Sequence, residues 1–168
     1  DLLQDRAKLK LLATVLGENE RLRILNPRLG QELFDELVNL PASQVASGIS
    51  MDTCELSEMD HTAMQLLARP EVRNRVAQQR GGHRLAENLQ QAVASSSALC
   101  LISTQSCTTH DIVNGGSAMQ RVWLEATAQG LSLQPVGTLP YMARLLNEPL
   151  GEVFDLEEHS KLKSLEQT

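Results

Sequence analysis

The residues able to bind a metal or attack a substrate are scattered along this chain. The four histidines, His61, His83, His110 and His159, have no His or Cys partner at the spacing of a metal site. No serine lies in the Gly-x-Ser-x-Gly pattern of hydrolases, so nucleophilic hydrolysis gains no support. Cys107 lies close to His110 near an expected helix start, an environment that could lower a thiol pKa. A loop cysteine without special reactivity is the simpler interpretation.

Two glycine pairs raise the question of a phosphate site. Neither Gly81-Gly82 nor Gly115-Gly116 fits the glycine-rich patterns that cradle phosphates. Gly115-Gly116 precedes an expected helix, whose start could accept an anion. Because no basic residue stands nearby, close packing on a neighbouring element is the favoured interpretation.

Helical periodicity and capping residues predict the elements that carry these groups. Asn26 followed by proline is a helix-start pair, and Ser57 with Asp60 resembles a capping box. Asp155 precedes two glutamates and then two lysines, the charge order that a helix dipole favours. We therefore expect helices over residues 7–16 and 27–37, from 57 onward with an interruption at 70, and over 85–93, 115–128, 141–146 and after 155, with a long loop over 41–49.

Two segments read as strands. Ala98 to Ile102 is a short continuous apolar run, which favours a buried strand in which Cys100 acts as a small hydrophobe. Leu131 to Gln134 alternates apolar and polar residues and predicts a second strand. The helix over 115–128 is apolar over much of its circumference and is expected to be buried. Two strands cannot cover so many helices, so we expect more strands from another segment or a partner chain. The alternative is an all-helical scaffold, which predicts that residues 98–102 are helical.

Composition bounds the class of protein. A chain of 168 residues suits one domain with one core. A net charge of −6 and an aromatic share of 2% argue against nucleic acid as a partner. Three cysteines without Cys-x-x-Cys spacing fit a reducing compartment. No apolar run approaches the roughly 18 residues of a membrane span, and no secretory leader opens the chain, so a cytoplasmic location without membrane contact is expected.

The segment from Gly116 to Leu131, followed by Gln134-Pro135-Val136-Gly137, resembles the late part of the nitroreductase superfamily. In that family a buried helix ends in an Ala-x-x-x-Gly-Leu turn and leads into a short strand and a proline-containing loop. The Trp-Leu-x-Ala-Thr pattern at 123–127 is similar to the divergent branch that includes mycobacterial Acg-like proteins and nitroreductase domains fused to ThiF-like adenylyltransferases. Weaker similarity covers residues 52–56, 67–72 and 98–103.

This resemblance implies a helix-rich α+β fold with a small mixed or antiparallel sheet, usually dimeric, as a homodimer or a fused pseudo-dimer. It implies FMN at the interface and hydride transfer between NAD(P)H and an electron-poor small molecule. It assigns cofactor binding to Pro135, Val136, Gly137 and Thr138, whose backbone would face the flavin ring. Amide donors near the ring N5 and small residues that allow a close approach suit such a site. An ordinary turn after an interior strand is the alternative for these residues.

Other family features have no match between Asp1 and Thr168. The Arg-rich segment that holds the FMN phosphate and the basic residue near a C-terminal strand are not found. We therefore interpret 1–168 as one nitroreductase-like domain, apparently incomplete at both ends. The functional hypothesis is an FMN-dependent NAD(P)H oxidoreductase without an assigned acid or base, in which Met119, Val122, Trp123 and Ala126 hold the supporting helix. The alternative is a non-catalytic lid, flavin-storage or dimerisation domain.

Overall fold

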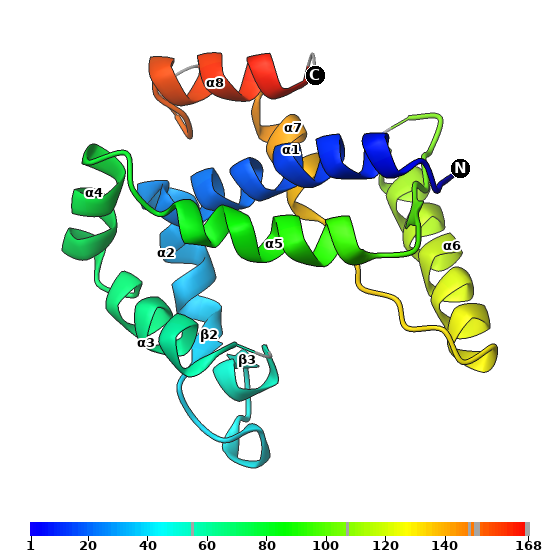
Figure 1. Ribbon diagram of the computed structural model, residues 1–168, viewed down its shortest axis with the longest axis horizontal. Coiled ribbons are helices and arrows are strands. Elements are labelled where there is room, and N and C mark those ends of the chain that lie inside the picture. The colour runs from blue at the N-terminus through cyan, green and yellow to red at the C-terminus, as the bar shows by residue number, and fades with distance from the viewer. Residues whose placement is uncertain (55, 107, 148, 150–151, 167–168) are drawn as a thin grey trace.

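The computed structural model describes residues 1–54, 56–106, 108–147, 149 and 152–166, and helices make up most of it (Figure 1). Its α-helices are α1 (Arg6–Leu25), α2 (Pro27–Glu36), α3 (Glu58–Leu67), α4 (Pro70–Gln78), α5 (His83–Ser95), α6 (Thr109–Ala128), α7 (Thr138–Leu145) and α8 (Leu156–Glu166). The shorter elements are the 3-10 turns η1 (Ala42–Gln44) and η2 (Met51–Thr53) and the strands β1 (Leu2–Leu3), β2 (Leu37–Val38), β3 (Ile49–Ser50) and β4 (Leu99–Cys100). None of the described helices is long and apolar enough to cross a membrane.

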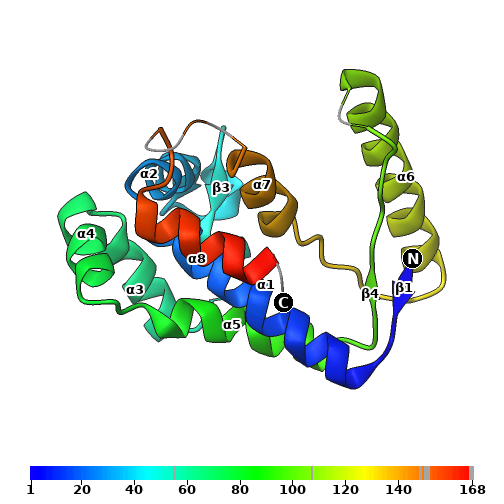
Figure 2. The same cartoon turned by 90° about the horizontal axis from the view of Figure 1, so that it is seen from above.

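The body of the molecule is built around α1, which lies antiparallel to α5 (Figures 1 and 2). Gly17 allows this close crossing, because a Cβ atom there would lie 2.5 Å from the carbonyl oxygen of Ala86. The expected helix over 7–16 continues for another nine residues, to Leu25. Its predicted apolar stripe is confirmed at Leu9 and Leu16, which are buried.

Three apolar clusters surround α1. One joins α1, α5 and the residues around the start of α7, with Ala13, Leu16 and Val93 at its centre. The second joins the α1–α2 corner to α3 and α4, and the third holds α7 and α8 against α2. Burying one large apolar side chain contributes about 1.5–3 kcal/mol, so these clusters fix how α7 sits on α1.

The predicted helix starts are confirmed where a local cap defines them. The Asn26 side chain accepts the amides of Arg28 and Leu29, both at 3.1 Å. The Ser57 hydroxyl accepts the amide of Asp60 at 3.1 Å, and the Asp155 carboxylate accepts the amide of Glu158 at 2.8 Å. Each cap satisfies amides that a helix leaves unpaired at its first turn.

The described strands form two separate two-stranded sheets. β1 pairs antiparallel with β4, with Leu2 opposite Cys100, and β2 pairs parallel with β3, with Leu37 opposite Ile49. A helix-rich α+β class is therefore confirmed, and the all-helical alternative is wrong because residues 98–102 contain β4. The expectation that this strand is buried is also wrong. Cys100 is exposed and Leu101 is 65% exposed, because among the described strands only β1 pairs with β4, and of its two residues only Leu99 packs against the cluster of α1 and α5.

The strand predicted over residues 131–134 is absent. Gly130 adopts a positive φ of 73°, and the amide of Leu131 donates to the carbonyl oxygen of Ala126 at 2.8 Å. This pattern ends a helix by satisfying its last carbonyl groups. The amide that a strand ladder would need is thus used to terminate α6.

Helix α6 differs from the prediction in both length and burial. It begins at Thr109, capped by Thr108, so Gly115 and Gly116 lie in its interior and not at its start. None of its described residues is buried. Figures 1 and 2 show α6 beside β1 and β4, away from the body built on α1. The expected burial fails because the other described elements do not cover its outer face.

Candidate functional site

The four predicted cofactor-binding residues lie where the chain enters α7. Pro135 and Gly137 are exposed, and Thr138 is the first residue of the helix. Val136 is half-buried and packs on the cluster around Ala13 and Leu16. The backbone of this loop is therefore anchored by one apolar side chain while its neighbours face solvent. The alternative, an ordinary turn after an interior strand, is wrong about the strand, because residues 131–134 form none.

The backbone amides at this point are free. Those of Gly137, Thr138 and Leu139 have no acceptor in the part of the chain that the structure describes. Gly137 is the N-cap of α7 and offers no side chain to cap these groups. A Cβ atom added there would meet nothing within 4 Å, and its φ of −97° is open to any residue. Neither the packing of this chain nor its backbone geometry therefore demands a glycine at 137.

A hollow of about 270 Å³ lies beside these amides, lined by Arg23, Gly137, Thr138 and Tyr141. The Thr138 hydroxyl donates to the Glu20 carboxylate at 2.5 Å. The same carboxylate forms a salt bridge with Arg23 at 2.7 Å. Thr138 and Arg23 are thus held in place through one shared carboxylate on α1.

Tyr141 forms the far wall of the hollow. Its hydroxyl donates to Glu32 at 3.1 Å, and Glu32 also accepts from Arg28 at 3.3 Å. Burial, together with the negative charge of Glu32, raises the pKa of Tyr141. The phenol therefore stays protonated at neutral pH.

The residues that complete this hollow were not predicted from the sequence. Arg23 and Glu20 lie more than a hundred residues before Thr138, and only the packing of α7 on α1 brings them together. The salt-bridge spacing of Glu20 and Arg23 is common on helix surfaces and carries no signal of a site. Tyr141 was predicted to be helical without a role in the site.

The predicted support for the loop is wrong. Met119, Val122, Trp123 and Ala126 belong to α6, which lies apart from the α1–α7 contact in both views (Figures 1 and 2). Val136 and Leu139 are instead held by α1 and α5. Helix α6 precedes the loop directly in the sequence, but it does not pack against it in space.

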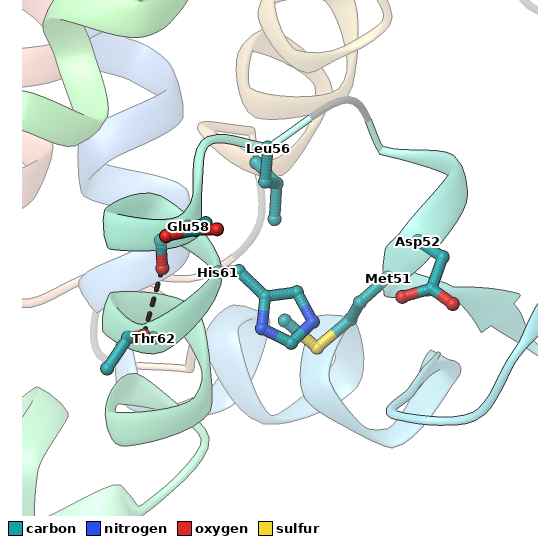
Figure 3. Close-up of a pocket in the computed structure, with 6 residues that line it drawn as sticks. All are labelled: Met51, Asp52, Leu56, Glu58, His61 and Thr62. Carbon is teal, nitrogen blue, oxygen red and sulfur yellow. Dashed lines mark hydrogen bonds between the residues drawn. The ribbon is translucent and has the colours of Figure 1, made fainter.

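A second hollow of about 420 Å³ lies where η2 meets the start of α3. In Figure 3, His61 and Met51 point toward one another from opposite sides of it. The dashed line is the hydrogen bond from the Thr62 hydroxyl to the carbonyl oxygen of Glu58, 2.9 Å, which belongs to the helix itself. His61 makes no hydrogen bond with a carboxylate in the described part of the chain, so no oriented base results. The lining residues are Met51, Asp52, Leu56, Glu58, His61 and Thr62.

The other groups with reactive side chains do not gather into a site. Among the described residues no three His, Cys, Asp or Glu side chains lie close enough to share a metal ion. His110 contacts Asn114 one turn later on α6, with 3.1 Å between Nδ1 and the amide nitrogen. Cys107, considered above as a reactive thiol, lies outside the described residues.

Comparison with known proteins gives one informative similarity. The chain is 35% identical over 143 residues to the uncharacterized protein MT1398 of Mycobacterium tuberculosis (strain CDC 1551 / Oshkosh). The aligned segment is 85% of this chain and 20% of that protein, so the chain spans about a fifth of the length of this relative. No protein-family model matches the sequence, and no solved structure matches it.

Proposed function

We propose that this chain is part of an FMN-dependent NAD(P)H oxidoreductase of nitroreductase type, in which residues 135–138 hold the edge of the flavin ring. The supporting observation is the row of free amides at Gly137, Thr138 and Leu139 beside an open hollow. Had these amides been paired and sealed inside the protein, the loop could not serve a ligand. The first amides of a helix have no acceptors within the helix, so where they face an open hollow they can bind an acceptor-rich ligand edge.

The residues present fit the ring of the cofactor. Gly137 leaves space above its backbone, so a planar ring can approach the amides without meeting a side chain. Val136 fixes the loop on the body through its packed side chain. When bound, FMN supplies hydride transfer, and the protein supplies orientation and electrostatics. No acid or base is needed from this chain for that role.

The side chains around the loop would set its electrostatics. The positive ends of the first amides of α7 and the guanidinium of Arg23 both favour negative charge on a ligand placed in the hollow. Glu20 compensates Arg23 and holds it in position. The Tyr141 side chain, which stays protonated, adds no charge to the wall of the hollow.

The hollow could hold the flavin ring but not the rest of FMN. At about 270 Å³ it lies just below the range of small-molecule sites, roughly 300–1,000 Å³. Arg23 and Arg28 are both paired with glutamates, so the proposal assigns the phosphate, NAD(P)H and the electron acceptor to residues beyond this hollow. A dimeric or pseudo-dimeric partner is one source of such residues.

The test is the visible spectrum and flavin fluorescence of the purified chain titrated with FMN. We expect saturable quenching, and bleaching of the bound flavin by NADPH under anaerobic conditions. Gly137→Ser should weaken FMN binding at least about tenfold, because a side chain there fills the open space through which the ring approaches the amides. Its helix content and melting temperature should be kept or raised. The matched control is Gln134→Ser in the same exposed loop, which should bind FMN as the unmodified chain does.

A non-catalytic role is the second candidate. The pairing of Arg23 with Glu20 leaves this hollow without an unpaired cation for a phosphate, which favours a lid, a flavin store or a dimerisation element. FMN binding without bleaching by NADPH would support this candidate. A chain that does not bind added FMN would contradict the oxidoreductase and the flavin store, and would leave only the lid or the dimerisation element.

A further inference from the structure

The hollow between η2 and the start of α3 brings together two side chains of types that bind copper. Met51 enters it from η2, and His61 enters it from α3. In Figure 3 the thioether of Met51 and the imidazole of His61 point toward one another. Both line a volume of about 420 Å³. The flavin site proposed at the start of α7 uses neither residue.

The backbone on both sides of the hollow is held by hydrogen bonds. Ser50 precedes Met51 directly, and its buried side chain donates to the carbonyl oxygen of Leu40 at 2.7 Å. The amide of His61 donates to the carbonyl oxygen of Ser57 at 2.8 Å, in the first turn of α3. The two side chains therefore project from fixed backbone, as a binding site requires.

The fold leaves the functional groups of both side chains unused. Met51 is 5% exposed, yet it belongs to none of the three apolar clusters around α1. The ring nitrogens of His61 have no hydrogen-bond partner among the described residues. A methionine sulfur also packs favourably against an aromatic ring. Such packing needs no nitrogen in the ring, so an experiment can separate it from the binding of an ion.

The charges around the hollow favour a cation. Asp52 and Glu58 lie on its wall, and the described residues that line it include no Lys or Arg. No three His, Cys, Asp or Glu side chains lie close enough to share an ion in the described part of the chain. The hollow therefore lacks the four ligands that zinc normally takes, and its carboxylates act through their charge.

We propose that Met51 and His61 bind a Cu(I) ion in this hollow, with the thioether sulfur and one imidazole nitrogen as ligands. Thioether sulfur is a soft ligand that selects Cu(I) over Mg²⁺ or Ca²⁺, and imidazole also suits copper. The methionine side chain has three rotatable bonds, so its sulfur can adjust to the ion. The site does not depend on FMN, and no electron transfer is assigned to it.

The test is a competition for Cu(I) between the chain and the chelator bicinchoninate, under anaerobic conditions with ascorbate as reductant. Because thiols bind Cu(I) themselves, the three cysteines are first replaced (Cys54→Ser, Cys100→Ser and Cys107→Ser). We expect saturable binding, with NMR shifts at the Met51 methyl group and the His61 ring. The same two signals, followed in the unmodified chain with Cu(I) in excess over its thiols, give a check that does not depend on these replacements.

Two variants separate binding of the ion from packing. Met51→Leu keeps the volume of the side chain and loses the sulfur, whereas His61→Phe keeps an aromatic ring and loses its nitrogens. Each should weaken Cu(I) binding at least about tenfold while the helix content is kept. The matched controls are Met59→Leu and His83→Phe, at exposed positions outside the hollow, and both should bind Cu(I) as their parent does.

Three results would overturn the proposal. The first is equal Cu(I) affinity in Met51→Leu, His61→Phe and their parent chain. The second is that added Cu(I) shifts neither the Met51 methyl signal nor the His61 ring signals. The third is displacement of Cu(I) by an equal concentration of Mg²⁺, because the acidic wall alone would then hold the ion and the sulfur would have no part in binding.

Discussion

At the scale of single residues, Asn26 joins elements that are distant in the sequence. Its side-chain oxygen caps α2, and its amide group donates to the carbonyl oxygen of Val153 at 2.9 Å and to the Glu158 carboxylate at 3.2 Å. It is 1% exposed. One buried amide therefore fixes the α1–α2 corner and the start of α8 together.

Replacing Asn26 should reveal this double role. Asn26→Ala removes a cap worth about 1 kcal/mol and leaves the Val153 carbonyl without a donor that costs a further 1–3 kcal/mol or so. We expect the free energy of unfolding in urea to fall by about 3 kcal/mol. Asn26→Ser keeps a cap acceptor and loses the amide donor without adding a charge, so it separates the two contributions. A loss below about 0.5 kcal/mol for Asn26→Ala would contradict the assignment.

Asp60 should make stability depend on acid. The hydrogen bond from Arg84, aided by Ser57, lowers the pKa of Asp60 from its ordinary 3.8 to about 2. A lowered pKa means that the ionised group favours the folded state above pH 3.8, and that this contribution is lost as pH falls toward 2. Arg84→Gln should move the pKa of Asp60 back toward 3.8 in a carboxyl NMR titration. An unchanged titration in the variant would rule out Arg84 as the cause.

At the scale of elements, cap chemistry and the apolar stripe of α1 could be predicted, whereas the exposure of α6 could not. The helix starts at Asn26, Ser57 and Asp155 were predictable because a side chain and amides two or three residues away define them. The exposure of α6, and the use of the Leu131 amide to end that helix and not to form a strand, depend on which elements lie nearby. An alternating or all-round apolar pattern indicates which side chains a segment could bury, but it does not indicate which elements pack against that segment.

The docking of α8 should weaken as pH rises. Burial raises the pKa of Glu158 above 4.5, and the hydrogen bonds from Asp155 and Asn26 only partly oppose this. With a raised pKa, the stabilisation is complete below pH 4.5 and is lost as pH rises through the raised value. We expect the melting temperature of Glu158→Gln, relative to the unmodified chain, to be higher at pH 7.5 than at pH 4.5. If the difference in melting temperature between Glu158→Gln and the unmodified chain were the same at both pH values, the raised pKa of Glu158 would be contradicted.

At the scale of the whole molecule, the candidate site belongs to the body, whereas the segment that suggested a resemblance to nitroreductases lies mainly on α6. Residues 135–138 were selected through that resemblance, and their proline and glycine by themselves mark only a loop. Arg23 and Glu20 could not be selected from the sequence, since their place beside Thr138 follows from how α7 packs on α1. Fold class was likewise predictable from periodicity, while the split into two small sheets depends on long-range pairing.

The separation of α6 from the body predicts that the two parts differ in local stability. Helix α6 has no buried residue among those described, whereas α1 buries Leu9 and Leu16. In the unmodified chain, the amides of α6 should exchange hydrogen with at least about 100-fold less protection than those of α1, as expected for a locally opening unit. Mass spectrometry of deuterium uptake by peptide provides the measurement. Equal protection in both helices would contradict the proposed independence of α6.

The central claim is that free amides at the start of α7 hold the edge of a flavin. Its most direct test is an amide NMR titration of the labelled chain with FMN, followed at Gly137, Thr138 and Leu139. The account predicts saturable shifts at these three amides in the unmodified chain and their loss in Gly137→Ser. Shifts confined to other parts of the chain, or none at all, would contradict it.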